Sequence, residues 1–562
     1  MFYRRMIKEL ENWRTNSFRK PLVIRGARQV GKTTLVHEFG KQFKQYIYLN
    51  LESAQDRLYF KNFRDIHQLF AQILLQHRMK KELVNETLLF IDEIQEMPEA
   101  VNILRYFKED LPELAVISAG SMLETLLGKN VTFPVGRVEY KVLRPVSFEE
   151  YLTALEEDQL LEEYAKLPIE NYAHSSLLES FHTYALIGGM PEIIQHYREH
   201  KDITALGPLY DSLIQSYIQD AEKYAKSEHQ LQLIRFCIHQ TIKKAGSRTS
   251  LVGFGNSNYS SKEIGEVLRA LEKTYLLHIL YPVTGTTLPL EPDQKKTPRI
   301  QFLDSGLINY NLGLQKDIIG TQDLHSVYKG TLIEHLTGQE LLAQKNLSLD
   351  KLHFWIRQKK QSDAEIDFLH VYNGKIIPIE VKPGAKGTLK SLQVFMDRSP
   401  LHFAIRLYAG EIKLDELKTK NGKPFHLLSL PYFLASQLDQ YIEWLLDQIG
   451  EHPDTQFIVK ESKEEYNVQK KVTKTWRIEE LNKKHLKILI SCKDSPQKGR
   501  ELIENELGMS YQSINKRKYL NSLRELKLLE FTDKENEKSK EQRYRLTAKG
   551  RKFIASKEIA TH

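Results

Sequence analysis

A glycine-rich stretch near the start of the chain has the residue types and the spacing of a phosphate-binding loop. The segment PLVIRGARQVGKTT places Gly26, Gly31, Lys32 and Thr33 at the fixed positions of the pattern G-x-x-x-x-G-K-T. Glycine lets the backbone turn so that its N–H groups face phosphate oxygens, and the lysine neutralises the β- and γ-phosphates. The residues expected to contact a nucleotide are Gly26, Ala27, Arg28, Gln29, Val30, Gly31, Lys32, Thr33 and Thr34.

Two acids at the end of a second apolar run supply the partners that such a loop needs. The segment TLLFIDEIQEM is continuously apolar up to Asp92 and Glu93, as expected of a parallel strand that is buried on both faces. Asp92 can hold a magnesium ion together with Thr33, and Glu93 can polarise the attacking water. ATP and Mg²⁺ are therefore the expected cofactors, and ATP hydrolysis is the expected reaction.

A third apolar run, LAVISAGS, ends in small polar residues. Ser118 or Ser121 can contact the γ-phosphate or the attacking water, and we favour Ser121 because it lies just past the apolar run. The strand expected next, VEYKVL, follows directly after Gly136 and Arg137.

A second set of chemically competent residues lies far along the chain. The segment AEIDFLHVYNGKIIPIEVK predicts a hairpin that turns at Asn373-Gly374 and brings Asp367 and Glu380 onto paired strands, with Lys382 on the same face as Glu380. Two acids can hold Mg²⁺ or Mn²⁺ between them, while the lysine positions or activates water. This pattern is typical of a PD-(D/E)xK nuclease core.

Glu334, near the start of the helix expected in GTLIEHLTGQELLAQ, supplies a third acid for the same metal shell. Asp363 and Glu365 are poorer candidates, since they lie in a charged approach to the strand that we expect to be solvated. The alternative is that Glu380 and Lys382 lie on the solvent-exposed face of a strand and bind no metal. A glutamate and a lysine on the wet face of a strand are ordinary and need no metal.

The length and composition of the chain indicate what class of protein carries these residues. A chain of 562 residues with 41% hydrophobic and 27% charged residues is typical of a globular protein with three or four domains. No apolar run approaches the roughly 20 residues of a membrane span, so we expect a cytoplasmic protein. Cys237 and Cys492 are too far apart for a ligand pattern. A net charge of +8 permits, but does not require, a polyanionic partner such as DNA.

The last part of the chain is predicted to be a separate nucleic-acid-binding unit. Polar residues 451–471 are expected to be a linker, and residues 472–562 have the helix and strand order of a winged helix. The expected recognition helix has a basic surface, and the segment DKENEKSKEQR would form the wing loop. The candidate contacts in that helix are Ser510, Ser513, Lys516, Arg517 and Lys518. The alternative is a winged helix that docks onto protein.

Several segments together resemble one family. KPLVIRGARQVGKTTLV, FIDEIQ, SAGSMLETLL, GRVEY, RPVSFEEYL and IGGMPEII are similar to segments of prokaryotic AAA-plus ATPases that carry a restriction-endonuclease-like domain at the C-terminal side. The resemblance covers about residues 1 to 445. It implies that Arg137 reaches the nucleotide of a neighbouring subunit in a homo-oligomer. The alternative is that Arg137 is a surface arginine that caps a strand.

The resulting expectation is an α/β multidomain protein. We expect six segments: a P-loop nucleotide-binding domain over residues 1–150, a helical lid over 151–226, a winged-helix-like connector over 227–300, a nuclease-like domain over 301–450, the linker over 451–471 and the C-terminal winged helix over 472–562. In the connector, the polar segment GSRTSLVGFGNSNYSSKE argues against DNA contact. The expected function is ATP hydrolysis coupled to a nuclease-like, DNA-binding module. An ATP-regulated nuclease, a DNA-bound regulator with an inactive nuclease fold and a signalling ATPase that binds protein all remain open.

Overall fold

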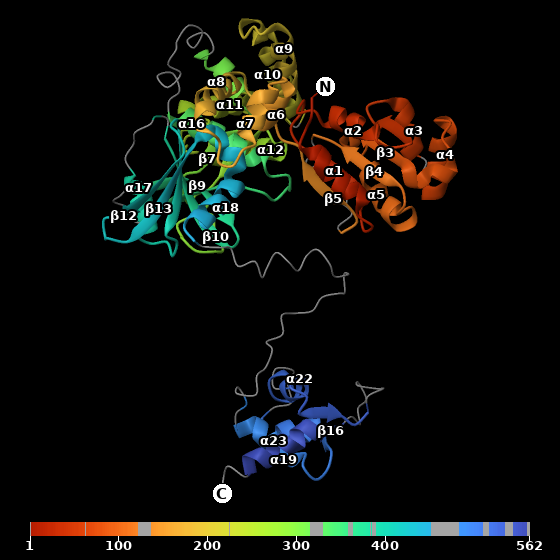
Figure 1. Cartoon of the computed structure of the whole chain (residues 1–562). Helices are drawn as coiled ribbons and strands as arrows, with labels where there is room; N and C mark the ends of the chain where they lie inside the picture. Colours follow the sequence, from red (N-terminus) through yellow and green to blue (C-terminus); the bar gives the residue numbers. More distant parts are fainter. Residues whose placement is uncertain are drawn as a thin grey trace. The chain divides into compact units, whose positions relative to one another are not determined.

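The computed structural model describes residues 2–61, 63–121, 136–223, 225–314, 330–357, 364–382, 384, 389–450, 481, 483–509, 516–533 and 543–558. The chain divides into two compact units, Met1–Pro453 and Asp454–His562 (Figure 1). The predicted linker at 451–471 lies outside the described residues. Within the first unit, one hydrophobic cluster extends from Met6 to Leu446, so the predicted segments there share a continuous core.

The first part of this unit is a parallel sheet between two layers of helices. Its strand order is β2-β3-β4-β1-β5, and all neighbouring strands are parallel. The strands are β1 (Leu22–Arg25), β2 (Gln45–Asn50), β3 (Thr87–Asp92), β4 (Ala115–Ala119) and β5 (Glu139–Val142). The helices are α1 (Met6–Thr15), α2 (Lys32–Gly40), α3 (Ala54–Lys61), α4 (Ile66–Gln76) and α5 (Pro98–Asp110).

Alternation along the strands decides which helices cover which face. Leu88 and Phe90 of β3 belong to the same hydrophobic cluster as α1 and α2, whereas Leu89 and Ile91 pack with α4 and α5. Because successive side chains of a strand point to opposite faces, a strand covered on both faces must be apolar throughout. All six positions of β3 are buried, which confirms the expected strand.

Helices dominate the next part of the chain. They are α6 (Phe148–Ala154), α7 (Asp158–Tyr164), α8 (His174–Ile187), α9 (Pro191–His200), α10 (Gly207–Glu222), α11 (Glu228–Lys243) and α12 (Ser261–Lys273). Gly188 ends α8 with a φ of 78° and Pro191 begins α9, as the sequence predicts. The strands β6 (Leu277–Leu280) and β7 (Arg299–Phe302) then form an antiparallel pair, and α13 (Ser305–Asn311) follows.

A second sheet carries the predicted hairpin. Its order is β12-β13-β11-β10-β9-β8, with β10, β11 and β13 mutually parallel. The strands are β8 (His353–Ile356), β9 (Glu365–Tyr372), β10 (Lys375–Val381), β11 (Phe403–Tyr408), β12 (Lys413–Lys418) and β13 (Pro424–Pro431). The helices are α16 (Gly330–Ala343), α17 (Lys390–Met396) and α18 (Leu438–Gln448). Asn373 and Gly374, with φ of 46° and 74°, form the two-residue turn that the sequence predicts.

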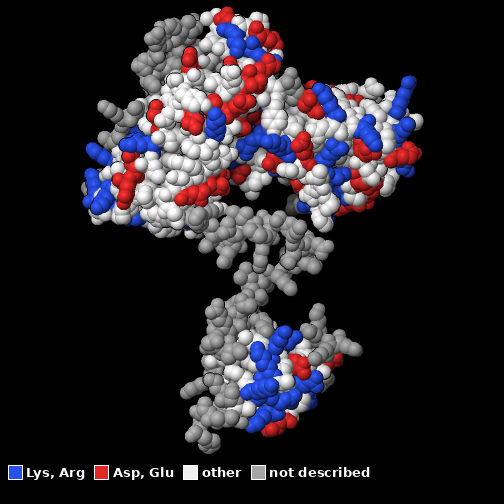
Figure 2. Space-filling model, viewed as in Figure 1, with Lys and Arg blue, Asp and Glu red and all other residues white. Residues whose placement is uncertain are grey.

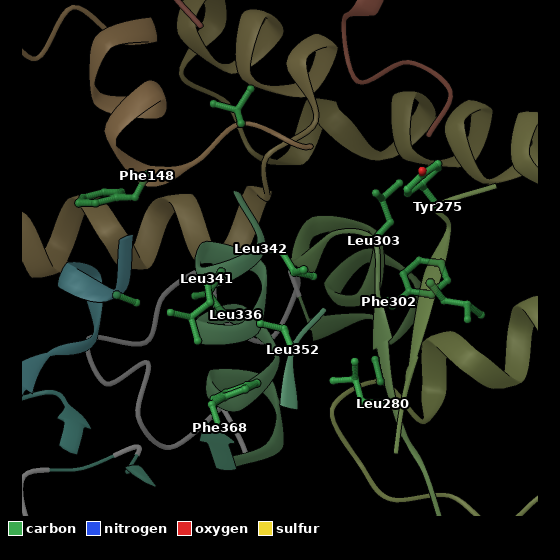
Figure 3. Packing of buried hydrophobic residues seen from close by; sticks show 14 of the residues in the cluster. Phe148, Tyr275, Leu280, Phe302, Leu303, Leu336, Leu341, Leu342, Leu352 and Phe368 are labelled. Atoms are coloured by element: carbon green, nitrogen blue, oxygen red, sulfur yellow. The ribbon is translucent and has the colours of Figure 1, made fainter. Parts of the chain in front are cut away.

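Helix α16 lies at the centre of the shared core. Figure 3 shows Leu336, Leu341 and Leu342 of this helix among side chains of other elements, including Phe368 of β9 and Leu352. Helix α16 also contacts β7, β10 and α13. The helix is therefore surrounded by protein, so its position is coupled to that of its neighbours.

The second unit is small and has its own core. Its elements are α19 (Lys483–Ser491), β14 (Gln497–Lys498), α20 (Gly499–Glu504), a π-helical turn (Lys516–Asn521), α22 (Ser522–Glu525), β15 (Leu529–Phe531), β16 (Arg543–Leu546) and α23 (Ala548–Glu558). The sheet order is β14-β16-β15. The sequence predicts only two of these strands and no helix after them, because β14 is two residues long and the last helix has a weak apolar pattern.

Candidate functional site

The phosphate loop joins β1 to α2 and has the backbone that its glycines permit. Gly26 and Gly31 have φ of 138° and 94°, and a Cβ on Gly26 would lie 2.3 Å from the carbonyl oxygen of Leu143. Lys32 is buried, and its Nζ donates to the carbonyl oxygens of Gly26 at 3.1 Å and Ala27 at 2.7 Å. Burial lowers the pKa of Lys32 to about 8. Both hydrogen bonds of this buried cation thus go to neutral oxygens.

Two oxygen ligands meet at the carboxyl end of β3. Thr33 Oγ1 donates to Asp92 Oδ2 at 2.7 Å, and the backbone N–H of Glu93 donates to Asp92 Oδ1 at 3.0 Å. Burial raises the pKa of Asp92. A hydroxyl beside a buried carboxylate suits Mg²⁺, which prefers hard oxygen ligands, so these residues fit the ion. When bound, Mg²⁺ would neutralise charge on the phosphate oxygens.

Glu93 occupies a strained position next to this pair. Its φ is 49°, a left-handed conformation that is uncommon for a residue with a side chain. Gln95 Nε2 donates to Glu93 Oε2 and holds the carboxylate in place. Strain of this kind is found at functional sites, where the surrounding structure fixes it. Glu93 lies on the cavity wall, so its carboxylate is placed to accept a proton from water.

A cavity of about 660 Å³ lies over the loop. Gln29, Lys32, Thr33 and Thr34 line it from the loop side. Its volume falls in the range of small-molecule sites, which is about 300–1,000 Å³. Ala27 and Val30 instead face the core, where both are buried.

Two further segments complete the cavity, and sequence reasoning missed them. Phe2 and Arg4 come from the N-terminal segment, and Pro191, Glu192 and Gln195 come from the first turns of α9. The segment IGGMPEII predicts a Gly-Gly turn and a proline at a helix start, but no contact with a nucleotide. No spacing rule links it to the loop, because the two segments are more than 150 residues apart.

The helical part of the unit also fixes the loop from outside. Arg28 Nη1 donates to Asp220 Oδ1 of α10 at 2.6 Å, and the hydroxyl of Tyr217 in the same helix donates to the Arg28 carbonyl oxygen at 2.9 Å. Arg4 Nη1 donates to the carbonyl oxygen of Val30 at 2.9 Å. The loop is therefore held in its shape by side chains from two other elements.

The remaining predicted residues of the nucleotide site have different positions. Ser118 is buried within β4, and Ser121 is nearly buried just beyond it. Arg137 precedes β5 at the amino edge of the sheet, because Glu139 pairs with Leu22 at the start of β1. Arg137 thus lies at the opposite edge from its own phosphate loop, and its Nε donates to Glu109 Oε1 at 2.8 Å. The roles of Ser121 and Arg137 stay predictions.

The predicted nuclease-like residues form a second, buried cluster. The backbone N–H of Val381 donates to Asp367 Oδ2 at 2.8 Å, and Lys382 Nζ donates to Glu380 Oε1 at 2.5 Å. Asp367 is 8% exposed and Glu380 is 4% exposed. A solvated strand face would leave the Glu380 carboxylate in water, so that alternative is wrong for Glu380, whereas the Lys382 side chain is 24% exposed.

An arginine that the sequence analysis did not consider lies among the same acids. Arg299 of β7 is 3.6 Å from Glu334 and 3.8 Å from Asp367, and it also pairs with Glu365. Glu365 is therefore a member of the cluster, and the expectation that it is solvated is wrong. Asp363 lies outside the described residues. Burial, with the charge of Asp367, raises the pKa of Glu334 to about 8 and that of Glu380 to about 7.

The acid cluster does not fit a divalent ion in this conformation. Across the described part of the chain, no group of three or more His, Cys, Asp or Glu side chains is arranged to hold a metal. At this cluster a guanidinium already lies within 4 Å of the carboxylate oxygens of Glu334 and Asp367. Metal binding by Glu334, Asp367 and Glu380 stays a prediction.

The second unit has a strongly basic surface. Figure 2 shows Lys and Arg side chains gathered on the face of this unit that is turned to the viewer. Lys516, Arg517 and Lys518 lie in the π-helical turn, and Ser510 and Ser513 fall outside the described residues, as does most of the predicted wing loop. Further basic residues of the unit are Lys487, Lys498, Arg500, Arg543, Arg545, Lys549 and Arg551.

Comparisons with known proteins agree with the phosphate loop. Residues 18–152 match the family model of the AAA domain. Residues 178–318 and 329–428 match two domains of unknown function, DUF8612 and DUF4143. No curated protein matches the chain. No helix among the described residues is long and apolar enough to cross a membrane.

Three solved structures match the chain at low sequence identity and low TM-score. The Walker-type ATPase of Pyrococcus abyssi is 14% identical over 56% of this chain and 96% of its own, with a TM-score of 0.36. A STAND signal transduction ATPase with a tetratricopeptide repeat sensor from Pyrococcus horikoshii is 14% identical over 61% and 48%, with a TM-score of 0.24. Drosophila ORC bound to DNA is 12% identical over 55% and 84%, with a TM-score of 0.20.

Proposed function

We propose that this AAA-plus ATPase uses helix α16 to couple its nucleotide cycle to a nuclease-like module that binds DNA. The chain is an ATP hydrolase, since residues 18–152 match the AAA domain and hold a complete phosphate loop. The observation that carries the coupling is the pair of contacts at the two ends of α16. Glu334, near the start of the helix, reaches the acid cluster, while Glu340, near its end, reaches the ATPase.

The contacts of Glu340 are buried and specific. Its carboxylate accepts hydrogen bonds from the backbone N–H of Phe148 at 3.2 Å and from the hydroxyl of Tyr184 at 2.6 Å. Phe148 begins the first helix after the ATPase sheet, and Tyr184 belongs to α8. Since a buried carboxylate that loses its donors is costly, these elements and α16 are expected to move together.

A second path leads from the wall of the nucleotide cavity to the same helix. The backbone N–H of Gly189 donates to Asp304 Oδ2 at 2.5 Å, and Gln339 Nε2 of α16 donates to the same oxygen at 3.3 Å. Gly189 is two residues before Pro191, which lines the cavity. A shift of α9 on nucleotide binding can therefore reach α16 through Asp304.

DNA is the proposed partner of the C-terminal unit, which we interpret as a winged helix. Its helix and strand order and its basic surface support this role. Phosphate contacts release counterions, so removal of residues 472–562 should weaken DNA binding and flatten its salt dependence. Reversing Lys516 and Arg517 to Glu should produce most of the same effect. An unchanged affinity across a salt series would favour a unit that docks onto protein.

The coupling is tested by ATP turnover with and without duplex DNA. We expect DNA to change the turnover rate of the parent chain, and Glu340→Gln to reduce that response while basal turnover persists. Asp350→Asn makes the same carboxylate-to-amide change beyond the end of α16 and serves as the matched control. A DNA response that is equal in the parent and in Glu340→Gln would refute the coupling through α16.

A homo-oligomer is the proposed assembly. Arg137 lies at the sheet edge away from its own phosphate loop, and that position suits an arginine that serves the nucleotide of a neighbouring subunit. The competing interpretation is the surface ion pair between Arg137 and Glu109.

Metal-dependent DNA cleavage is a second candidate function. The adjacency of Asp367, Glu380 and Lys382 favours it, because these residue types at this spacing are those of PD-(D/E)xK nucleases. A nicking assay on plasmid DNA with Mg²⁺ or Mn²⁺ tests it directly, and Asp367→Ala should abolish any cleavage. The absence of cleavage in the parent chain would leave the DNA-bound regulator as the function.

A further inference from the structure

Arg299 reaches the acid cluster from outside the sheet that carries it. It is the first residue of β7, which pairs with β6, whereas Glu365 and Asp367 belong to β9 of the six-stranded sheet. Its Nη2 is 3.6 Å from Glu334 Oε2 and 3.8 Å from Asp367 Oδ1, and it also donates to Glu365 Oε1. One nitrogen thus approaches carboxylates from both α16 and β9.

The guanidinium of Arg299 is buried and makes further contacts within the cluster. Arg299 is 3% exposed, and its Nη1 donates to the backbone carbonyl oxygen of Asp367 at 3.1 Å. The guanidinium carbon lies 4.8 Å from the ring centre of Phe354 and 5.8 Å from that of Phe368. Burial alone would lower the pKa of Arg299, but the charges of Glu334, Asp367 and Glu365 raise it. The arginine therefore stays charged where it lies.

The cluster contains more carboxyl groups than positively charged groups. Arg299 and Lys382 face four carboxylates, those of Glu334, Glu365, Asp367 and Glu380. Glu380 Oε2 is buried and has no hydrogen-bond partner among the residues that the structure describes. The position between the carboxylates, which a divalent ion would need, is next to a fixed positive charge.

We propose that Arg299 is the resident cation of this cluster and takes the place of a divalent metal ion. A metal lies about 2.0–2.6 Å from its carboxylate oxygens, and an ion at that distance from both Glu334 and Asp367 would meet the guanidinium. The two positive charges would also repel each other in a buried site. The inference rests on the proposed function, because it explains how a nuclease-like module binds DNA without a metal-dependent reaction.

Manganese binding tests this proposal in the full chain. Asp92→Asn is introduced into every variant so that the phosphate loop contributes no metal site, and Mn²⁺ is titrated by calorimetry. We expect no manganese binding that depends on Asp367 in the parent background. Arg299→Met removes the cation while keeping much of the side-chain length, and it should raise Mn²⁺ affinity by at least ~10-fold, since Glu334 and Asp367 then lose the guanidinium that pairs with them.

Three controls make the outcome decisive. Arg299→Lys keeps a positive charge and should gain no manganese site. Arg248→Met removes another arginine that pairs with Glu365, at 3.4 Å but at a more exposed position, and should also gain none. Adding Asp367→Asn to Arg299→Met should abolish the new binding. A folded Arg299→Met chain that binds no manganese would overturn the proposal.

The test remains decisive if Arg299→Met does not fold. Equal manganese titrations of the parent and Asp367→Asn then support the proposal, and a bound ion that is lost in Asp367→Asn overturns it. DNA binding, measured separately by fluorescence anisotropy, tests the proposed function independently of the role of Arg299. A chain with the expected manganese pattern but no affinity for DNA would remove the proposed function and leave the role of Arg299 intact.

Discussion

Lys32 and Arg299 are both buried cations, but their partners differ and their pKa values shift in opposite directions. Both side chains are more than nine-tenths buried. The ammonium of Lys32 donates to two neutral carbonyl oxygens, and burial lowers its pKa to about 8. The guanidinium of Arg299 is surrounded by carboxylates, which raise its pKa despite burial.

The difference lies in the partners and not in the depth of burial. A buried charge that donates its hydrogen bonds to neutral groups and is only partly compensated by nearby acids gains strongly from an added opposite charge, such as a phosphate. A buried charge that is already compensated gains little from further anions and repels cations. Lys32 therefore belongs to a site prepared for a ligand, whereas the charge of Arg299 is already compensated by carboxylates of its own chain.

The largest expected effect is on nucleotide binding. Lys32→Ala should abolish ATP binding, because it removes the charge that opposes the β- and γ-phosphates. Calorimetry with ATP and Mg²⁺ measures this effect. Lys41→Ala is the matched control, since Lys41 is an exposed lysine paired with Glu38. Normal ATP affinity in Lys32→Ala would show that Lys32 does not bind the phosphates.

Stability should respond with opposite signs at the two cations. Arg299→Met leaves buried carboxylates without their partner, so we expect the free energy of unfolding to fall by ~3–5 kcal/mol. The hydrogen bonds of Lys32 to described residues go to neutral carbonyl oxygens, and Glu93 and Asp92 offset only part of its burial cost, so Lys32→Met should be neutral or stabilising without nucleotide. Urea unfolding of both variants gives the comparison. A loss of similar size at both positions would contradict it.

The catalytic step gives the next largest effect. Glu93→Gln should bind ATP normally but hydrolyse it at least ~100-fold more slowly, since the water loses its base while Lys32 still holds the phosphates. Single-turnover kinetics separates the two steps. Glu96→Gln, a change at an exposed glutamate three residues after Glu93, is the control. A rate near that of the parent would assign the base to another residue.

The buried acid Glu340 should make the stability of the protein depend on pH. Glu340 accepts hydrogen bonds only from the neutral groups of Phe148 and Tyr184, and burial raises its pKa to about 7 from 4.5. Its folded form binds a proton more tightly than its unfolded form, so its contribution to stability is present below pH 4.5 and is lost as the pH rises through about 7. Unfolding free energies between pH 4.5 and 7 should fall less steeply in Glu340→Gln. Parallel curves for parent and variant would disprove this.

The smallest stability effect is expected at an exposed arginine. Arg137 is 52% exposed and pairs with Glu109, a surface pair that contributes about 0–1 kcal/mol. Arg137→Ala should therefore fold normally. If Arg137 acts across a subunit interface, the variant should lose ATPase activity, and mixing it with inactive Glu93→Gln subunits should restore some. Intact oligomers without such complementation would favour the surface role.

Local patterns predicted those parts of the chain whose structure depends on neighbours in sequence. The hairpin turn at Asn373-Gly374 and the buried strand before Asp92 are both set within a few residues. The strands β11, β12 and β13 were not predicted. Strand β11 joins the sheet by pairing with β10, whose last residues are more than 20 positions earlier in the chain, and β13 and β12 then add to β11 in turn. The sequence does not reveal the ion pair of Glu365, because its partner Arg299 is 66 residues away in the chain.

The sequence by itself determined the phosphate loop, because Gly26, Lys32 and Thr33 lie on one short segment whose spacing fixes their geometry. It also determined that Asp367, Glu380 and Lys382 share a hairpin. Only the tertiary structure placed Arg299 among those acids, since β7 pairs with β6 outside their sheet. The charge balance of a buried site depends on every group that folding brings near it, and Coulomb interactions follow distance in space, which sequence spacing does not reveal over such separations.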